Sequence, residues 1–333
     1  MKKTWVLWML ILFTTGIVRA EKKPLVVTTA SIFADMATVL SGGLVEVTSI
    51  VPIGGDPHIY EPTPGDAQLV TKADLILKNG FTFEGWLSEL IENSGTLAKV
   101  VTITEGIQPI ESSLYKNSSD PHAWMSAANG LIYIKNIKDA LIALDSVHIR
   151  EYEFNYDIYV KQIKEVDDYI KAEIQKIPPQ RRILITSHDA FRYYGQRYGI
   201  NVEAILGTST DADAQTSDLV RLNKIIKESG IPAVFIETTV NPKLLEQLAS
   251  SNHIGIGGKL YSDSIGDKDS PAPSYLEMLL FNTNTIVGAL SQNITPDQEE
   301  KNANLGSTNW WLLGVLGILL LGGFFIMFKR LNT

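Results

Sequence analysis

Short apolar runs alternate with longer stretches of mixed polarity through most of the chain, and this order predicts strands alternating with helices. Such alternation is typical of parallel sheets whose faces are covered by helices. The apolar runs predict strands at 25–29, 45–51, 74–78, 99–103, 182–186, 202–206 and 233–237. The mixed stretches predict helices at 31–40, from 63 onward, and at 83–93, 189–198, 213–229, 242–251 and 273–290. Thr63 and Pro64 are the expected N-cap and first-turn residue of the second helix.

One charged stretch, 146–177, is longer than the others and has few helix breakers before Pro178 and Pro179. It predicts a single long helix that divides the alternation into two parts. We therefore expect an α/β fold of two lobes with parallel sheets, 24–145 and 178–291, joined by a linking helix at 146–177. In such folds the loops at the carboxyl ends of the strands are where ligands bind.

The beginning of the chain has the pattern of a targeting segment. Residues 1–20 contain Lys2 and Lys3, then the almost wholly apolar run 5–13, and end in small residues around Arg19. This order of basic, apolar and small residues predicts a signal peptide, with an uncleaved anchor as the alternative. The protein is therefore expected to be exported.

The end of the chain carries a second apolar segment. The run 310–328 has no charge and is long enough to span a bilayer, with Trp310 at one edge and Lys329 and Arg330 at the other. It predicts a transmembrane helix whose basic end faces the cytoplasm. The polar residues 292–309 predict a flexible stem. The expected location is the periplasmic or extracellular face of the cytoplasmic membrane, with anchoring through 310–328.

Composition narrows the chemistry of the exported part. The chain of 333 residues has a formal net charge of −8, which argues against a nucleic-acid partner and does not oppose the attraction of cations. It contains no cysteine, so its stability cannot come from disulfides. Any metal site must then use imidazole and carboxylate ligands.

Three of the five histidines occur in loops that follow predicted strands. His58 and His122 each complete an Asp-Pro-His tripeptide, His188 follows the strand at 182–186, and Asp263 lies in a later loop. Four nitrogen and oxygen ligands from separate loops suit a divalent transition metal between the lobes. Any one of these histidines alone is more often a solvent-exposed or structural residue than a metal ligand. The remaining histidines are expected at the surface, and nearby acids are expected to be second-layer partners or simple turn residues: His148, His253, Asp56, Asp120, Asp189 and Asp267.

The sequence around these residues resembles the zinc and manganese solute-binding proteins of ABC importers. The resemblance covers roughly 24–291 and rests on 55–64 (GDPHIYEPTP), 73–76 (ADLI), 120–125 (DPHAWM), 187–191 (SHDAF), 235–237 (FIE) and 258–263 (GKLYSD). It implies two α/β lobes with a rigid linking helix and a metal ion bound between them by His58, His122, His188 and Asp263. The three-histidine, one-aspartate set makes zinc the first choice, with manganese and ferrous iron open.

The resemblance also implies a function without catalysis: capture of a metal ion outside the membrane and delivery to a membrane permease, by a monomer. A metal-dependent hydrolase is the main alternative. The chain has neither a His-Glu-x-x-His motif nor a Gly-x-Ser-x-Gly elbow, and four protein ligands would leave no position for a reacting water. A surface adhesin is a third possibility that no residue pattern here encodes.

Overall fold

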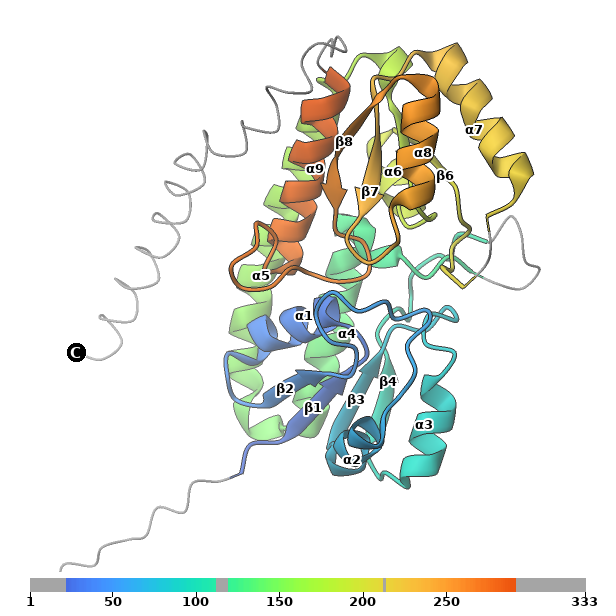
Figure 1. The fold of residues 1–333 in the computed structure, drawn as a ribbon. Coiled ribbons are helices and arrows are strands. Elements are labelled where there is room, and N and C mark those ends of the chain that lie inside the picture. Colours follow the sequence, from blue (N-terminus) through green and yellow to red (C-terminus); the bar gives the residue numbers. More distant parts are fainter. Residues whose placement is uncertain (1–21, 112–118, 212–213, 292–333) are drawn as a thin grey trace, which may run out of the picture.

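The computed structural model describes residues 22–111, 119–211 and 214–291, and it consists of two α/β lobes stacked along one long helix (Figure 1). The predicted signal peptide (1–20), stem (292–309) and membrane anchor (310–328) lie outside these ranges. Within the described ranges, no helix combines the length and the apolar character needed to cross a bilayer.

The N-terminal lobe contains a four-stranded parallel sheet in the order β2-β1-β3-β4. Its strands are β1 (Leu25–Thr28), β2 (Glu46–Ser49), β3 (Leu75–Lys78) and β4 (Lys99–Thr102). Its helices are α1 (Ser31–Ser41), α2 (Pro64–Lys72), α3 (Leu87–Ser94) and α4 (Ala127–Leu144). Alternate strand side chains enter different cores: Val26 faces the side of α1 and α4, while Leu25 and Val27 face the side of α2 and α3.

The C-terminal lobe also combines parallel strands with helices, but its described strands form two two-stranded sheets. Its strands pair in parallel as β5 (Ile183–Thr186) with β6 (Asn201–Ala204), and β7 (Ala233–Glu237) with β8 (Gly255–Leu260), and β5 lies beside β7. Its helices are α6 (Arg192–Tyr198), α7 (Thr216–Ser229), α8 (Lys243–Asn252) and α9 (Tyr275–Ser291). The parallel sheets and the α/β class confirm the expectation from the alternating pattern.

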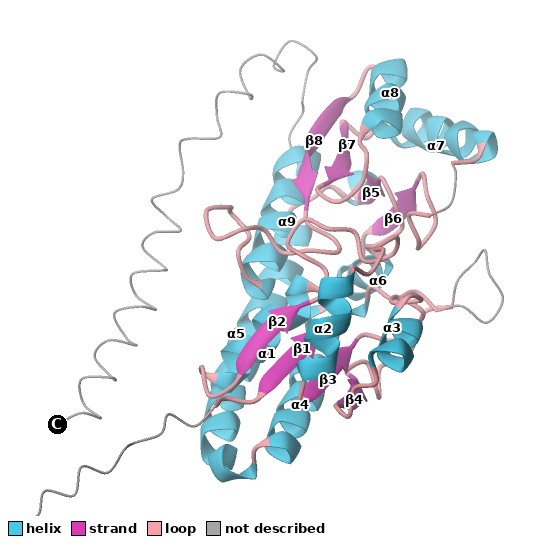
Figure 2. Cartoon of the chain, turned by 60° about the horizontal axis from the view of Figure 1, so that its bottom comes forward, coloured by secondary structure: helices cyan, strands magenta, loops and turns pink. Residues whose placement is uncertain are grey.

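The helix α5 (Ile149–Ile174) runs past both lobes and packs against α1 and α4 in one and α9 in the other (Figures 1 and 2). Short 3₁₀ turns precede it at Ser146–His148 and follow it at Pro179–Arg181. One buried cluster of apolar side chains is continuous from the N-terminal lobe through α5 to α9. This continuity fixes the lobes against each other along α5.

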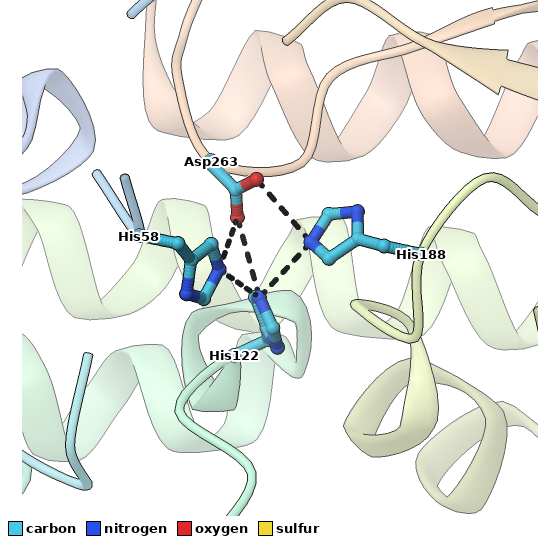
Figure 3. A group of neighbouring side chains, drawn as sticks. All are labelled: His58, His122, His188 and Asp263. Atoms are coloured by element: carbon cyan, nitrogen blue, oxygen red, sulfur yellow. Dashed lines mark hydrogen bonds and ion pairs between the residues drawn. The ribbon is translucent and has the colours of Figure 1, made fainter. Parts of the chain in front are cut away.

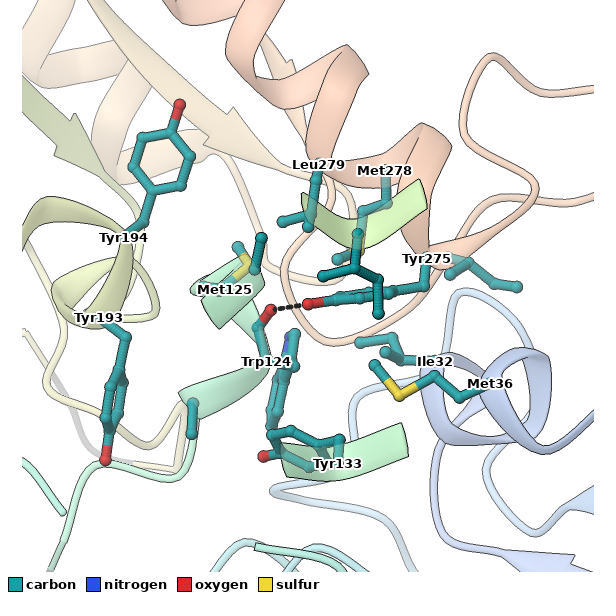
Figure 4. Packing of buried hydrophobic residues seen from close by; sticks show 14 of the residues in the cluster. Ile32, Met36, Trp124, Met125, Tyr133, Tyr193, Tyr194, Tyr275, Met278 and Leu279 are labelled. Atoms are coloured by element: carbon teal, nitrogen blue, oxygen red, sulfur yellow. Dashed lines mark hydrogen bonds between the residues drawn. The ribbon is translucent and has the colours of Figure 1, made fainter. Parts of the chain in front are cut away.

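At the centre of that cluster, aromatic residues tie the two lobes together (Figure 4). Trp124, in the 3₁₀ turn Ala123–Met125, donates its indole N–H to the carbonyl of Ser262 in the C-terminal lobe at 2.9 Å. Tyr275, at the start of α9, donates its hydroxyl to the Trp124 carbonyl at 2.7 Å. Trp124, two residues after the candidate ligand His122, is thus held by the lobe that carries the candidate ligand Asp263.

Four expected helices begin three or four residues later than the pattern suggested, namely α3, α5, α6 and α7, and one helix opens as expected. The stretch 83–86 forms turns, and helix α3 starts only at Leu87; α6 likewise starts at Arg192. Helix α2 has Thr63 as N-cap in a capping box with Asp66, and Pro64 in the first turn. Helix α4 and strand β8 were not predicted.

Candidate metal centre

The structure brings His58, His122, His188 and Asp263 into one cluster between the lobes (Figure 3). Each side chain comes from a loop after the carboxyl end of a parallel strand: β2, β4, β5 and β8, respectively. One potential ligand atom from each residue lies within 4.8 Å of all the others. The side chains are buried, with 4% of the His58 side chain exposed and none of the other three.

The distances within the cluster are those of atoms that share one ion. The Nε2 atom of His122 lies 3.1 Å from Nε2 of His58 and 3.2 Å from Nε2 of His188. It also lies 3.3 Å from Oδ1 of Asp263, which is 3.8 Å from Nε2 of His58. Ligands bound at about 2.0–2.1 Å in a tetrahedron are separated by about 3.3 Å. The cluster therefore has the dimensions of a four-ligand site.

Carboxylates behind two of the histidines determine which ring nitrogen faces the cluster. Nδ1 of His122 lies 2.8 Å from Oδ1 of Asp120, and Nδ1 of His188 lies 2.7 Å from Oε2 of Glu237. A carboxylate oxygen only accepts hydrogen bonds, so Nδ1 of His122 carries a proton. The ion-pair contact with Glu237 favours a proton on Nδ1 of His188 as well. In the neutral rings Nε2 then presents a lone pair to the cluster. Lone pairs of adjacent rings repel unless a cation lies between them.

Asp263 supplies the negative charge of the cluster. Its Oδ2 accepts long hydrogen bonds from Thr239 (3.3 Å) and Ser262 (3.4 Å). Its Oδ1 is buried and has no hydrogen-bond partner among the described residues. Burial favours the neutral carboxyl, but the charges and hydrogen bonds of His188 and His122 outweigh it and hold the pKa of Asp263 well below its usual range. The ionised carboxylate faces His58 and His122 with Oδ1 and His188 with Oδ2, an arrangement that suits a cation.

The histidines differ in their protonation. Burial lowers the pKa of His58 to about 3, and the charge of Asp263 only partly offsets it. Burial also opposes charge on His122, but contacts with Asp120 and Asp263 outweigh it and raise its pKa to about 9. Burial works the same way on His188, whose pKa is nevertheless raised well above the usual value by the charges of Glu237 and Asp263. An incoming ion therefore displaces protons from His122 and His188.

The acids expected near the site play unequal parts. Asp120 holds both the backbone N–H and the ring of His122, and Asp56 accepts the backbone N–H of His58 at 2.9 Å. Asp189 makes an ion pair with Arg192 at 3.7 Å, and Asp267 closes a local turn with Ser270 and Asp269. These last two are structural.

Glu237 was part of the motif 235–237 but was given no role from the sequence, although both of its oxygens contact His188. Its Oε1 accepts the backbone N–H of His188 at 2.8 Å, while Oε2 faces the ring. The available signal was a carboxylate at the end of a wholly buried strand. His253 is exposed at the end of α8, and His148 is partly exposed beside Asp145, so neither belongs to the cluster.

Two lobes around a buried cluster of imidazole and carboxylate groups define a solute-binding protein for a cation. The sequence profile of one family, described as "ZnuA: Zinc-uptake complex component A periplasmic", matches residues 26–289. The chain belongs to this family of zinc and manganese solute-binding proteins of ABC importers, which confirms the resemblance inferred from its motifs.

Individual relatives support the same family and differ in the metal they are named for. The chain is 35% identical to the manganese-binding lipoprotein MntA of Halalkalibacterium halodurans, over 80% of this chain and 88% of the relative. It is 34% identical to the iron-binding protein YfeA of Yersinia pestis, over 81% and 88%. The structure of the periplasmic zinc-binding protein TroA of Treponema pallidum superposes with a TM-score of 0.78 at 33% identity, covering 81% of this chain and all of that one.

Proposed function

We propose that the protein captures one divalent transition metal ion outside the membrane and delivers it to the permease of an ABC importer. His58 and His122 from the N-terminal lobe and His188 and Asp263 from the C-terminal lobe are the proposed ligands. The observation that carries the proposal is the buried convergence of three Nε2 atoms and the unpartnered Oδ1 of Asp263. Because both lobes contribute ligands, a movement at the permease that withdraws the ligands of one lobe would release the ion.

Zinc is the proposed first choice of metal, followed by manganese and iron. Three neutral imidazoles and one carboxylate oxygen match the ligands and the four-coordinate geometry that zinc prefers. Manganese prefers oxygen ligands, of which this cluster offers only those of Asp263. The relatives named for manganese and for iron keep those ions as competitors.

Binding without catalysis follows from the same geometry. The four proposed donor side chains are almost wholly buried, and four protein donors would fill the four positions that zinc prefers. A metal-dependent hydrolase would need an exchangeable position for water at the ion. We propose a monomeric carrier and not an enzyme.

Titration calorimetry on His58→Ala, His122→Ala, His188→Ala and Asp263→Ala tests the ligand set. Each variant should bind zinc much more weakly than the wild type, because each removes one of four donors. Wild-type affinity in all four variants would refute the assignment. Elemental analysis of protein purified from medium that contains zinc, manganese and iron together tests the choice of metal.

We further propose that residues 1–20 direct export and that residues 310–328 anchor the protein, through the stem 292–309, on the outer face of the cytoplasmic membrane. The supporting feature is the uncharged run 310–328 between Trp310 and the basic pair Lys329 and Arg330. The proposed body comprises the lobes 24–145 and 178–291, joined by the segment 146–177 that contains α5. Deleting 306–333 should release soluble protein, and membrane retention of the truncated protein would refute the anchor.

A further inference from the structure

The loop that carries His58, residues 50–63, reaches across to the C-terminal lobe at two points. The backbone N–H of Gly54 donates to Oγ of Ser264 at 2.8 Å. The hydroxyl of Thr210 donates to Oδ2 of Asp56 at 2.6 Å. Ser264 follows Asp263, and Thr210 lies in the loop after β6. The position of the His58 loop therefore depends on contact between the lobes.

Asp56 connects the cross-lobe contact to the histidine. Its Oδ1 accepts the backbone N–H of His58 at 2.9 Å, while its Oδ2 accepts the Thr210 hydroxyl. The carboxylate is planar and rigid, so fixing one oxygen fixes the direction of the other. Within its own lobe, the loop is held by the indole N–H of Trp86, which donates to the carbonyl of Pro57 at 2.8 Å. Thr210 thus acts on His58 through Asp56, from the opposite lobe.

The His58 side of the cluster is also its side nearest to solvent. His58 is the only one of the four candidate ligands that is not classed as a buried residue. Ile53 and Ile59, on either side of it in the loop, are 50% and 55% exposed. His122 and His188 are held from behind by buried carboxylates and cannot withdraw without unpairing them. An ion leaving the cluster passes most readily where the His58 loop lifts.

We propose that Thr210 is a positioning residue for His58, and that the hydrogen bond between Thr210 and Asp56 holds the loop 50–63 closed over the bound ion. This bond sets how fast the ion leaves. The inference rests on the proposed function, because it assumes that His58 is a ligand. The inference adds that the ion leaves the cluster at His58, and that Thr210 of the other lobe controls its release.

Thr210→Val tests the proposal, since valine has nearly the shape of threonine and lacks the hydroxyl. Thr210→Ser keeps the hydroxyl that Thr210→Val removes. Thr38→Val is the matched control, because the Thr38 hydroxyl is exposed and bonds only the carbonyl of Ala34 in its own helix. Zinc-loaded proteins are mixed with excess chelator and the release rate is measured. Association is followed by rapid mixing of zinc with metal-free protein.

We expect Thr210→Val to release zinc about tenfold faster, the effect of losing one hydrogen bond to a charged group. Its association rate should change much less. Thr210→Ser and Thr38→Val should release zinc at about the wild-type rate. Thr210 lies in a partly exposed loop, so circular dichroism of Thr210→Val should match the wild type.

Two results would overturn the proposal alone: a wild-type release rate in Thr210→Val, or a release rate in Thr210→Ser as fast as in Thr210→Val. In both cases the wild type still binds zinc, and the proposed function stands. A wild-type protein that binds neither zinc, manganese nor iron would instead overturn the proposed function, and this inference with it.

Discussion

The chain contains the tripeptide Asp-Pro-His twice, and the two copies hold their histidines in different ways. In both, the aspartate accepts the backbone N–H of the histidine, at 2.9 Å for Asp56 and His58 and 3.0 Å for Asp120 and His122. Asp120 is fully buried and also holds the ring of its own histidine. The second oxygen of Asp56 instead accepts a hydrogen bond from Thr210 in the other lobe.

One local sequence thus produces a histidine whose ring is held by its own aspartate, and another whose aspartate is bonded by a residue of the other lobe. The two rings also differ in their pKa values. Asp120 is a main cause of the raised pKa of His122, at about 9, while His58 lacks such a partner and its pKa is lowered by burial to about 3. The loop of the first tripeptide is suited to moving His58 away from the cluster, and the second tripeptide is suited to keeping His122 in place.

The largest difference in zinc affinity should be between variants of the two histidines themselves. His122→Ala removes the donor that lies within 3.3 Å of His58, His188 and Asp263, and leaves the Asp120 carboxylate buried without its partner. We expect it to weaken zinc binding by about 10³-fold. His58→Ala, on the solvent side, should cost about ten times less. Calorimetry measures both, and equal losses would remove the distinction between a fixed and a movable ligand.

The next largest difference in zinc affinity should be between variants of Asp120 and of Asp56. Asp120→Asn keeps the shape of the side chain but removes the charge behind His122, and should weaken zinc binding by about 10–100-fold. Asp56→Asn can keep its oxygen on the His58 N–H and donate its amide N–H to the Thr210 hydroxyl, and it should cost less than about tenfold. Competition with a chelator measures both affinities. A larger loss in Asp56→Asn than in Asp120→Asn would reverse the comparison.

Metal binding should release a proton from His122, in the second tripeptide, and none from His58, in the first. In the metal-free protein the pKa of His122 is about 9, so it is protonated at pH 7 and must lose that proton when Nε2 binds the ion. Affinity should therefore fall as the pH falls below 9. With a pKa of about 3, His58 is neutral at pH 7 and has no proton to release.

Calorimetry at pH 7 in buffers of different ionisation enthalpy counts the released protons. His58→Ala should release as many protons as the wild type, and His122→Ala about one fewer. The same count in all three proteins would show that His122 is not charged before the ion binds.

The smallest effect should come from removing the hydrogen bond that Trp86 donates to the first tripeptide within its own lobe. Trp86→Phe keeps an aromatic ring beside Tyr60 but removes the N–H that bonds the Pro57 carbonyl. We expect zinc release to be about threefold faster, as for the loss of one neutral hydrogen bond. Stopped-flow measurement with a chelator tests this. Slower release in Trp86→Phe would contradict the view that a loosened loop opens the site.

Much of the fold follows from local pattern. Buried strands such as β3 and β7 are short apolar runs, and parallel strands place their carboxyl ends together, which is why residues as distant as His58 and Asp263 meet. Strand β8 was missed because Gly257 and Gly258 weaken a strand pattern. A Cβ at Gly257 would lie 2.6 Å from the ring of Phe235, so these glycines serve close packing that only the folded chain reveals.

The rest of the site depends on contacts between distant elements. Glu237 reaches His188 only because β7 lies beside β5, and no local pattern near either residue records that adjacency. Thr210 reaches Asp56 only because the lobes meet. The Asp-Pro-His tripeptide indicated a stiff turn in both copies, but whether its aspartate would hold its own histidine or the other lobe could not be read from it.

The most direct test of the central claim is a crystal structure of the zinc-loaded protein with anomalous diffraction measured at the zinc edge. The account predicts one strong anomalous peak bonded to Nε2 of His58, His122 and His188 and to an oxygen of Asp263, at about 2.0–2.2 Å. A peak outside this cluster, or one bonded to residues of a single lobe only, would contradict it.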